Sequence, residues 1–539
     1  MSLSFTKLID VPNPSYVQVL KNRILSITSF SLLRKGTISQ YDLNVGKFTA
    51  ASREEPQTLS GDYLWPNELS QFVDQSGHTV TLVPDGFLLP GQNDGGLYAI
   101  RDPLSAQQSR PIRITKSKPG WFHHKAAHVR LPGGREGILT ARARKPFFGQ
   151  GEGELVWLAM PAKDTVWHSS CSVVEGGDGE EQQGIEIDTA LNAPWEETVL
   201  ATGPDVMFEV VDLNPADDCV EVIAAHFFGS QLSVHSLRAK KTSPYVEVVE
   251  SYTLQTQGRP YGLCLASMPA EAGAEAWGDS EGVGGLVEAA GIAGVRTLDK
   301  KVAFSHLLVS THECSYDLPS AIGMALAALR GKYPRVKTGG AGDFRNGERL
   351  PLESGRQASA SAAGGSLFAY ELPINVKQAP PFGGQGGGYL WKRHTLFRGF
   401  KVRGWGGIFS PGAPGFPYVF NMPGRPHAPP LILLAGDCTG SAYIFAPIKS
   451  CGDSTYSDSS SSSSSNRRSI INSSSHRLNG FDNSVPTYEL AFEVECGATV
   501  GSAAVMPTND NSGDVEIFVP SYELNRVHAF RLHEDPCEE

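Results

Sequence analysis

Histidine is the residue type in this chain with the clearest capacity for chemistry. His123 and His124 are adjacent, and His226 and His312 each follow an apolar, β-favouring run. An imidazole can move a proton near neutral pH, and three imidazoles from neighbouring elements can ligate zinc or iron. We therefore take His124 and His226 as a candidate acid/base pair, and His123, His226 and His312 as weaker candidate metal ligands. The alternative is that each ring packs against an aromatic neighbour with its nitrogens hydrogen-bonded.

Basic and aromatic side chains accompany these histidines. Arg142 or Arg144 could polarise a carbonyl oxygen, and only one is expected to face inward because their strand is expected to bulge at Lys145 and Pro146. An aromatic wall excludes water and holds flat molecules, as in many small-molecule sites. The candidate substrate-binding residues are Trp65, Trp121, Phe227, Tyr261 and Tyr418, with Asp85 as a polar group.

The elements that position these residues are short strands in a repeated four-strand pattern. In one stretch, residues 206–213, 220–225 and 231–237 are β-favouring runs separated by turn residues, and residues 245–254 supply a fourth run. Four strands of this length bury too little surface to be stable alone. The unit therefore needs neighbours of the same shape.

Six further copies of the pattern follow from the sequence. They occupy residues 23–43, 80–100, 137–158, 303–372, 431–445 and 515–530. Seven such units arranged radially form an all-β, seven-bladed β-propeller, with the whole chain, 1–539, as one domain. The last unit lacks a fourth strand, and Ser2 to Asp10 could supply it beside Val527 to Leu532 and close the ring. A pair of β-sandwiches is the alternative fold.

Three insertions interrupt the repeats. Residues 268–300 and 317–365 are rich in Ala, Gly, Glu and Ser, and one amphipathic stretch, 318–332, could form a short helix. Residues 449–485 include seven consecutive serines, Ser459 to Ser465. Such compositions cannot bury enough apolar surface to offset the entropy of ordering, so we expect these low-complexity insertions to be largely loop or disordered.

Composition excludes several classes of function. The chain has 539 residues, a net charge of −11 and 19% charged residues, which argues against binding nucleic acid. No apolar run is long enough to span a membrane, and the N-terminus has no apolar signal segment. Eight scattered cysteines are most simply reduced thiols. We therefore expect a cytoplasmic protein that does not contact a membrane.

Two units carry a family resemblance. GWFHHKAAHVRLPGGREGILTARA (120–143) and GPDVMFEVVDLNPADDCVEVIAAHFFGSQLSVHSL (203–237) resemble the FG-GAP/VCBS-type propeller repeat, over about residues 115–240. This chain lacks most of the turn aspartates of that repeat, so its calcium sites are not expected here. Proteins built on such repeats include adhesion modules, lectin-like proteins and the propeller domain of aldos-2-ulose dehydratase. The last resemblance implies a metal-dependent sugar lyase as one alternative function.

Two further functions remain open from the residues themselves. One is a non-redox enzyme, a cyclase, isomerase or lyase, which acts on a small molecule in an aromatic-lined central channel, with specialised-metabolite biosynthesis as one setting. The absence of any nucleotide fingerprint agrees with that reading, and we expect no cofactor, with a divalent metal as the open alternative. The other is a scaffold for a protein partner, a frequent use of propellers, which fold alone cannot exclude.

Overall fold

A computed structural model describes most of the chain. The described residues are 1–31, 34–44, 57–74, 77–87, 92–101, 111–145, 150–160, 195–268, 304–313, 364–373, 391–400, 402, 412–425, 428–448, 486–510 and 512–534. The serine run, the amphipathic stretch at 318–332 and nearly all of the three insertions lie outside them.

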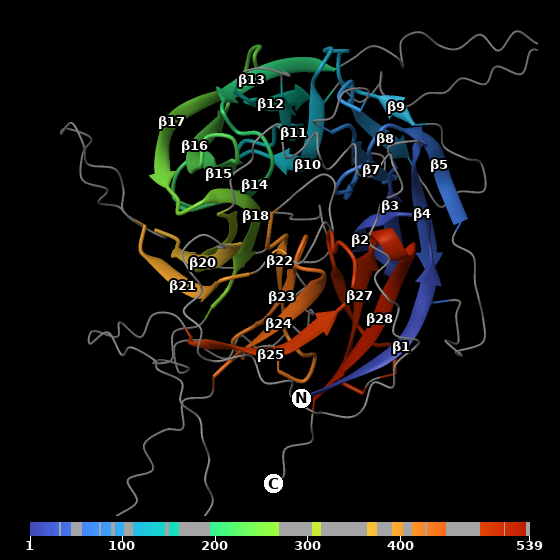
Figure 1. The fold of residues 1–539 in the computed structure, drawn as a ribbon. Coiled ribbons are helices and arrows are strands. Elements are labelled where there is room, and N and C mark those ends of the chain that lie inside the picture. Colours follow the sequence, from blue (N-terminus) through green and yellow to red (C-terminus); the bar gives the residue numbers. More distant parts are fainter. Residues whose placement is uncertain are drawn as a thin grey trace, which may run out of the picture.

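Across these residues the strands form seven four-stranded antiparallel sheets around a common centre (Figure 1). This is the predicted seven-bladed β-propeller. Strands follow one another outward within each sheet, and the first strands of neighbouring blades, such as β18 and β22, pack together. The described part of the chain contains no helix that could cross a membrane.

Each blade is defined by its strands, from the centre outward. Blade 1 is β2 (Pro14–Leu20), β3 (Ile24–Ser29), β4 (Gly36–Asp42) and β5 (Gln57–Tyr63); blade 2 is β6 (Ser70–Val73), β7 (Thr79–Pro84), β8 (Leu97–Arg101) and β9 (Ile112–Arg113). Blade 3 is β10 (Phe122–Arg130), β11 (Glu136–Arg144), β12 (Glu152–Ala159) and β13 (Glu196–Thr202); blade 4 is β14 (Phe208–Val211), β15 (Cys219–His226), β16 (Gln231–Ala239) and β17 (Val246–Gln255). Blade 5 is β18 (Arg259–Ala266), β19 (His306–His312), β20 (Gly365–Glu371) and β21 (Arg393–Arg398); blade 6 is β22 (Pro417–Phe420), β23 (Leu431–Ala435), β24 (Ser441–Pro447) and β25 (Tyr488–Glu495). Blade 7 is β26 (Ala504–Pro507), β27 (Val515–Ser521), β28 (Arg526–His533) and β1 (Ser2–Asp10), and short 3-10 turns occupy Lys21–Arg23 and Tyr522–Leu524.

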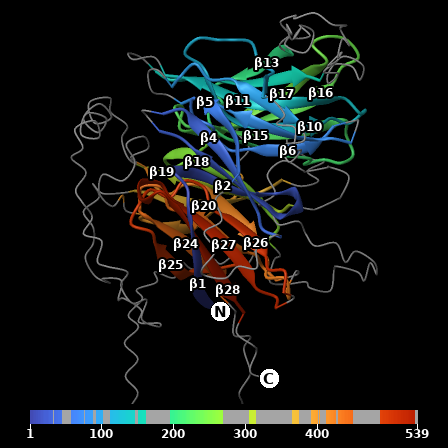
Figure 2. The same ribbon diagram turned by 90° about the vertical axis from the view of Figure 1, so that its right-hand side faces the viewer.

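The N-terminal strand closes the ring. β1 pairs antiparallel with β28, from Ser2 opposite His533 to Asp10 opposite Arg526, with a bulge between Phe5 and Lys7. The start of the chain therefore lies beside the end of its last strand, near the label N in Figures 1 and 2. This pairing confirms the predicted closure by Ser2 to Asp10 and covers the edge of β28.

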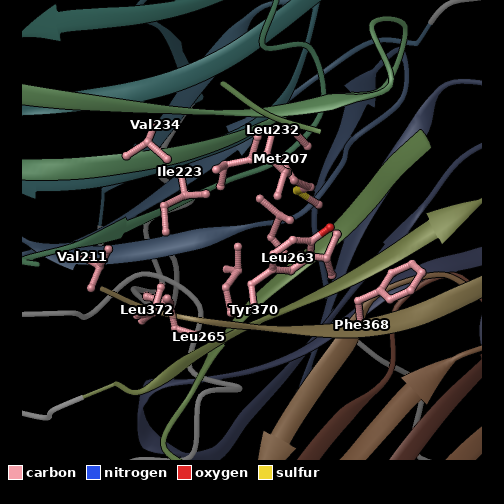
Figure 3. Packing of buried hydrophobic residues seen from close by; sticks show 14 of the residues in the cluster. Met207, Val211, Ile223, Leu232, Val234, Leu263, Leu265, Phe368, Tyr370 and Leu372 are labelled. Carbon is pink, nitrogen blue, oxygen red and sulfur yellow. The ribbon is translucent and has the colours of Figure 1, made fainter. Parts of the chain in front are cut away.

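Packing between blades explains why so many strands are apolar on both faces. In β15, Val222 and Ala224 pack toward blade 3, whereas Ile223 and Ala225 pack toward blade 5. Figure 3 shows the second of these interfaces, where Met207, Ile223 and Leu232 of blade 4 meet side chains of blade 5 such as Leu263. Alternate side chains point to opposite faces of a strand, so a strand between two blades needs apolar residues at successive positions.

Candidate active site

A cavity opens at the centre of the propeller where the first strands begin and the second strands end. Its volume is about 60 Å³, which gives room for about four or five water-sized groups. Five blades contribute to this mouth cavity. The residues that line it are Pro14, Ser15, Tyr16, Phe30, Trp65, Asn67, Phe87, Tyr261, Phe416, Asp437, Thr499, Gly501 and Tyr522.

One wall of the mouth cavity is a stack of three aromatic rings. The Trp65 ring lies between Phe30, at a centroid distance of 3.5 Å, and Phe87, at 4.4 Å. The ring of Tyr522 contacts Phe30 at 5.0 Å. Because aromatic rings in such stacks support one another, this wall is a preformed apolar surface.

The opposite wall is built from tyrosine, phenylalanine and histidine rings. Tyr261 stacks on His312 with centroids 4.4 Å apart, and Phe416 lies 4.9 Å from Tyr261 and 5.6 Å from Tyr16. Burial lowers the pKa of His312 to about 3, so its ring is neutral at pH 7. The neutral ring hydrogen-bonds through Nε2 to the carbonyl of Pro414 at 2.9 Å, which fixes the ring under Tyr261.

Asn67 lines the mouth cavity, and its side chain is held by two hydrogen bonds. Its Nδ2 atom donates to the carbonyls of Gly86 (3.0 Å) and His123 (2.7 Å), which fixes the side chain between blades 2 and 3. Its Oδ1 atom is buried and has no hydrogen-bond partner, and the residue is only 1% exposed. A buried acceptor without a partner costs stability, so this position carries an energetic penalty in the fold.

Asp437 brings a carboxylate to the same space. Its backbone has a left-handed φ of 48° and exchanges hydrogen bonds with Val500 at 3.0 and 3.2 Å, which joins blade 6 to blade 7. The Oδ2 atom lies 3.9 Å from Nε2 of His312, and the Cys438 thiol donates to Oδ1 at 3.6 Å. The strained backbone thus holds the Asp437 carboxylate at the cavity. Backbone strain of this kind is frequent at functional sites.

Tyr16 supplies a phenol that keeps its proton. Burial raises the pKa of Tyr16 well above its usual value of 10, and the carboxylates of Glu68 and Asp437 raise it further. The hydroxyl therefore stays protonated at neutral pH. The mouth cavity combines a phenol and a carboxylate residue between apolar walls.

Beneath the mouth cavity lies a group of polar residues that we call the channel cluster. It consists of Glu68, Lys125, Glu209, Tyr418 and Ser502, one from each of five blades. The Lys125 ammonium lies 3.2 Å from Glu209 and 3.9 Å from Glu68, and the hydroxyls of Tyr418 and Ser502 are hydrogen-bonded. Burial raises the pKa of Tyr418 well above 10, with Glu68 as the second cause.

Besides the histidines, the structure brings five of the residues singled out from the sequence to the mouth cavity, its supports or the channel cluster. Trp65 and Tyr261 line the cavity. Phe227 packs against Tyr261 and His312 with centroids 5.8 and 5.7 Å away. The Asp85 carboxylate accepts the backbone N–H groups of Trp65 (2.6 Å) and Leu64 (3.1 Å), and Tyr418 belongs to the channel cluster.

Trp121, Arg142 and Arg144 do not line the mouth cavity. The buried Arg142 guanidinium forms ion pairs with Glu154 at 2.7 Å and Glu197 at 2.8 Å. All three residues belong to blade 3. Arg142, one of the two arginines considered for an inward-facing role, therefore forms a structural ion pair. Arg144 pairs with Glu152 at 2.8 Å, and Lys118 lies 3.7 Å above the Trp121 ring.

The remaining candidate histidines also lie outside the cavity lining. His226 hydrogen-bonds through Nε2 to Ser233 at 2.7 Å, and His123 hydrogen-bonds through Nδ1 to Thr140 at 3.1 Å. His124 packs edge to face against Phe87 and Phe122, behind the cavity wall. Burial lowers the pKa of both His124 and His226 to about 4, so neither is poised for proton transfer near neutral pH.

The three candidate metal ligands do not converge. Each ring hydrogen-bonds in a different part of the propeller. His123 bonds to Thr140 in blade 3, His226 bonds to Ser233 in blade 4, and His312 bonds to Pro414 in the loop before blade 6. In the described ranges no three His, Cys, Asp or Glu side chains are grouped so that they could hold a metal ion.

Sequence reasoning missed Tyr16, Asn67, Glu68 and Lys125 as site residues, although each lies in a first-strand stretch of the predicted blades. Their common signal is position. Each falls at or just before the start of a blade's first strand or within its first few residues, where the seven strands converge. Residue type alone gives no such signal, because polar residues are frequent at exposed strand ends.

Comparisons with known proteins identify no family for this chain. No protein-family description matches the chain, and no curated protein matches it. Solved structures that resemble it include the N-terminal domain of Nup159 (10% identity, 99% of this chain and 93% of that chain, TM-score 0.35). Another is the polysaccharide lyase Uly1 (9% identity, 97% of this chain and 90% of that chain, TM-score 0.35). A third is an alpha-L-arabinofuranosidase from Fusarium graminearum (7% identity, 87% of this chain and 93% of that chain, TM-score 0.33). Identities and TM-scores this low carry no argument about function.

Proposed function

We propose that this protein is a non-redox enzyme, a cyclase, isomerase or lyase, that acts on a small molecule bound in the mouth cavity. Asp437 accepts a proton from the substrate and returns it to another atom, and the Tyr16 phenol donates a hydrogen bond to the substrate. The observation that carries the proposal is that a carboxylate residue, Asp437, and a protonated phenol, Tyr16, line one cavity between aromatic walls.

The three reaction types share the same demand on the protein. Each removes a proton from one atom of the substrate and returns a proton to another, without transfer of electrons to a cofactor. Asp437 and Tyr16 line one cavity, so one substrate can contact both. The aromatic walls orient the substrate and exclude water.

This assignment replaces the histidine pair expected from the sequence. His124 and His226 are neutral, buried and outside the cavity lining, so they support the wall and blade 4 rather than contact a substrate. His312 acts from behind Tyr261. Its Nε2 atom lies 3.9 Å from Oδ2 of Asp437, and its hydrogen bond goes to the Pro414 carbonyl.

The scaffold alternative has less support at the surface. Among the residues that the structure describes, exposed large apolar side chains such as Phe5, Val199 and Val249 belong to the outer strands of different blades. Single apolar residues of this kind are ordinary on a protein surface. The combination of aromatic and polar groups lies at the channel mouth, where a small molecule would bind.

The test is a turnover screen with the full chain. Purified protein is incubated with a defined mixture of small molecules, and mass spectrometry after chromatography detects products that are isomers of a substrate or have lost water or ammonia. Asp437→Asn and Tyr16→Phe should each lower turnover at least about a hundredfold, which is typical for loss of an acid or base. Asp218→Asn, in an exposed turn of blade 4, makes the same chemical change away from the cavity and should retain full turnover. Full activity in folded Asp437→Asn and Tyr16→Phe would refute the proposal.

A further inference from the structure

The Tyr16 hydroxyl is within reach of a ligand in the mouth cavity. Tyr16 lines the cavity, and its backbone is fixed at the start of β2, where its N–H donates to Oγ1 of Thr28 at 3.3 Å. Among the residues that the structure describes, none hydrogen-bonds to the Tyr16 hydroxyl, and its oxygen is not one of the fully buried atoms that lack a partner. The hydroxyl therefore keeps accessible surface and a free hydrogen-bonding capacity.

This phenol acts on a ligand as a hydrogen-bond donor. Burial raises the pKa of Tyr16 well above its usual value of 10, so the hydroxyl keeps its proton at pH 7. A fixed donor of this kind contributes most to a reaction when negative charge develops on the acceptor atom in the transition state. Tyr16 therefore favours a substrate with an oxygen acceptor that gains charge during the reaction.

Asp437, the proton acceptor of the proposed function, adds a chemical constraint. A carboxylate is a weak base, so it removes a proton from carbon only where the electron pair left behind can move onto an electronegative atom. A carbonyl beside that carbon meets this condition, because its oxygen takes the charge and a phenol can donate to the resulting enolate. Together, Tyr16 and Asp437 favour carbonyl compounds with a hydrogen on the adjacent carbon.

The walls of the cavity favour a flat molecule. The Trp65 ring is nearly parallel to Phe30 and Phe87, with interplanar angles of 20° and 10°. On the other side, Phe416 lies 5.6 Å from Tyr16 and 4.9 Å from Tyr261, measured between ring centroids. Unsaturated, planar groups pack well on such rings. The cavity volume of about 60 Å³ matches a planar group of only a few heavy atoms.

We infer that the substrate is an enolisable ketone or aldehyde with a flat, unsaturated frame, whose carbonyl oxygen accepts a hydrogen bond from the Tyr16 hydroxyl. This inference rests on the proposed function and names the substrate class of the same site. Polarisation of a carbonyl, the role expected from the sequence for Arg142 or Arg144, is thereby assigned to Tyr16.

An isomerisation shows how atoms and electrons balance. The C–H bond next to the carbonyl breaks, the proton passes to Asp437, and the electron pair enters an enolate whose oxygen accepts the Tyr16 hydrogen bond. The Asp437 carboxyl then returns the proton to the carbon at the far end of the conjugated system, and the carbonyl forms again. No electron leaves the substrate, so the step needs no oxidant or reductant.

Nuclear magnetic resonance on the full-length wild-type protein tests the carbonyl requirement. The probes are cyclopent-2-en-1-one, labelled with carbon-13 at the carbonyl, and 3-methylidenecyclopent-1-ene, in which a CH₂ group replaces the oxygen. The ketone should bind, the hydrocarbon should bind at least about tenfold more weakly, and the carbonyl resonance should move to higher frequency on binding. Failure of the ketone to bind, or equal binding of the hydrocarbon, would overturn the inference. Either result would leave the proposed function standing, because its own test is Asp437-dependent turnover of any compound.

A matched pair of variants assigns the contact to Tyr16. Tyr16→Phe should remove both the shift of the carbonyl resonance and the preference for the ketone. Tyr245→Phe makes the same change in the turn between β16 and β17 of blade 4 and should behave like the wild type. An unchanged resonance shift in folded Tyr16→Phe would overturn the inference. If Tyr16→Phe does not fold, the comparison of the ketone with the hydrocarbon in the wild type decides alone.

Discussion

The carboxylate of Asp85 accepts the backbone N–H of Trp65 at 2.6 Å, and this contact holds the indole between Phe30 and Phe87. A second N–H, that of Leu64, donates to the same carboxylate at 3.1 Å. Asp205 in blade 4 accepts the N–H groups of Phe227 and Phe228 in the same manner, at 2.7 and 2.8 Å. Buried aspartates thus position two of the aromatic residues at or behind the cavity walls.

Asp85→Ala should therefore lower stability and disturb the aromatic wall. The substitution leaves two buried N–H groups without an acceptor, which costs about 2–4 kcal/mol of unfolding free energy. Chemical denaturation measures this loss, and Trp fluorescence of the folded variant should show a changed indole environment. Asp85→Asn keeps one acceptor oxygen and should lose less. Wild-type stability in Asp85→Ala would show that the carboxylate does not support the wall.

Arg142 and Arg144 should differ sharply when each is replaced by alanine. Arg142→Ala removes the side-chain cation from Glu197 and one of two cations from Glu154 in a largely buried setting, and it should cost about 3 kcal/mol. Arg144→Ala removes an exposed pair with Glu152 and should leave the melting temperature nearly unchanged. Thermal unfolding of the two variants provides a matched comparison. Similar melting temperatures for both would contradict the structural role given to Arg142.

Buried histidines should make the fold sensitive to acid. Burial lowers the pKa of His124 from its usual 6.5 to about 4, so between these values the unfolded chain binds a proton that the folded chain does not. The stability linked to this group is complete above about pH 6.5 and is lost as the pH falls toward 4. His226, His235, His306, His312 and His528 are shifted in the same direction.

His124→Phe isolates one contribution to this acid sensitivity. The His124 ring lies against Phe87 and Phe122, and its Nδ1 atom has no hydrogen-bond partner, so a phenyl ring suits the site. Between pH 7 and pH 5 the variant should lose less unfolding free energy than the wild type, by on the order of 1–2 kcal/mol. Urea denaturation across this range measures the difference. Identical pH profiles would show that His124 is not the source.

Ring closure predicts that the first ten residues matter for stability. Their removal exposes the edge of β28 and uncovers the core around Ile9, which is 2% exposed. The melting temperature should fall by several degrees. Phe5→Ser, at an exposed position of the same strand, serves as the control and should have a small effect. An unchanged melting temperature after the deletion would count against closure by β1.

The fold was predictable because its physical signal is local and repeated. In blade 4 the predicted runs 206–213, 220–225, 231–237 and 245–254 correspond to β14, β15, β16 and β17. Apolar runs bounded by turn residues mark strands buried between two blades. The outer strand of blade 1, Gln57–Tyr63, was not predicted, because its sequence QTLSGDY lacks an apolar run.

The site was only partly predictable, because side-chain direction depends on bulges that the sequence does not reveal. A bulge between His123 and Lys125 changes the alternation in β10, so that His123 faces Thr140 and Lys125 faces Glu209 in the channel. Trp65 and Tyr261 were found because aromatic residues recur where the first strands begin. The acceptors Asn67 and Asp437 converge only through the closed ring, which joins residues far apart in sequence.

Equilibrium dialysis tests most directly whether the mouth cavity is a small-molecule site. Wild-type protein, Phe87→Trp and Phe5→Trp are dialysed against the same mixture of small molecules, and mass spectrometry identifies what each retains. Phe87 lines the cavity and a larger ring there should fill it, whereas Phe5 lies exposed on β1. We predict at least one molecule that the wild type and Phe5→Trp retain and that folded Phe87→Trp loses. Retention of the same molecules by all three proteins would contradict a ligand site at the channel mouth.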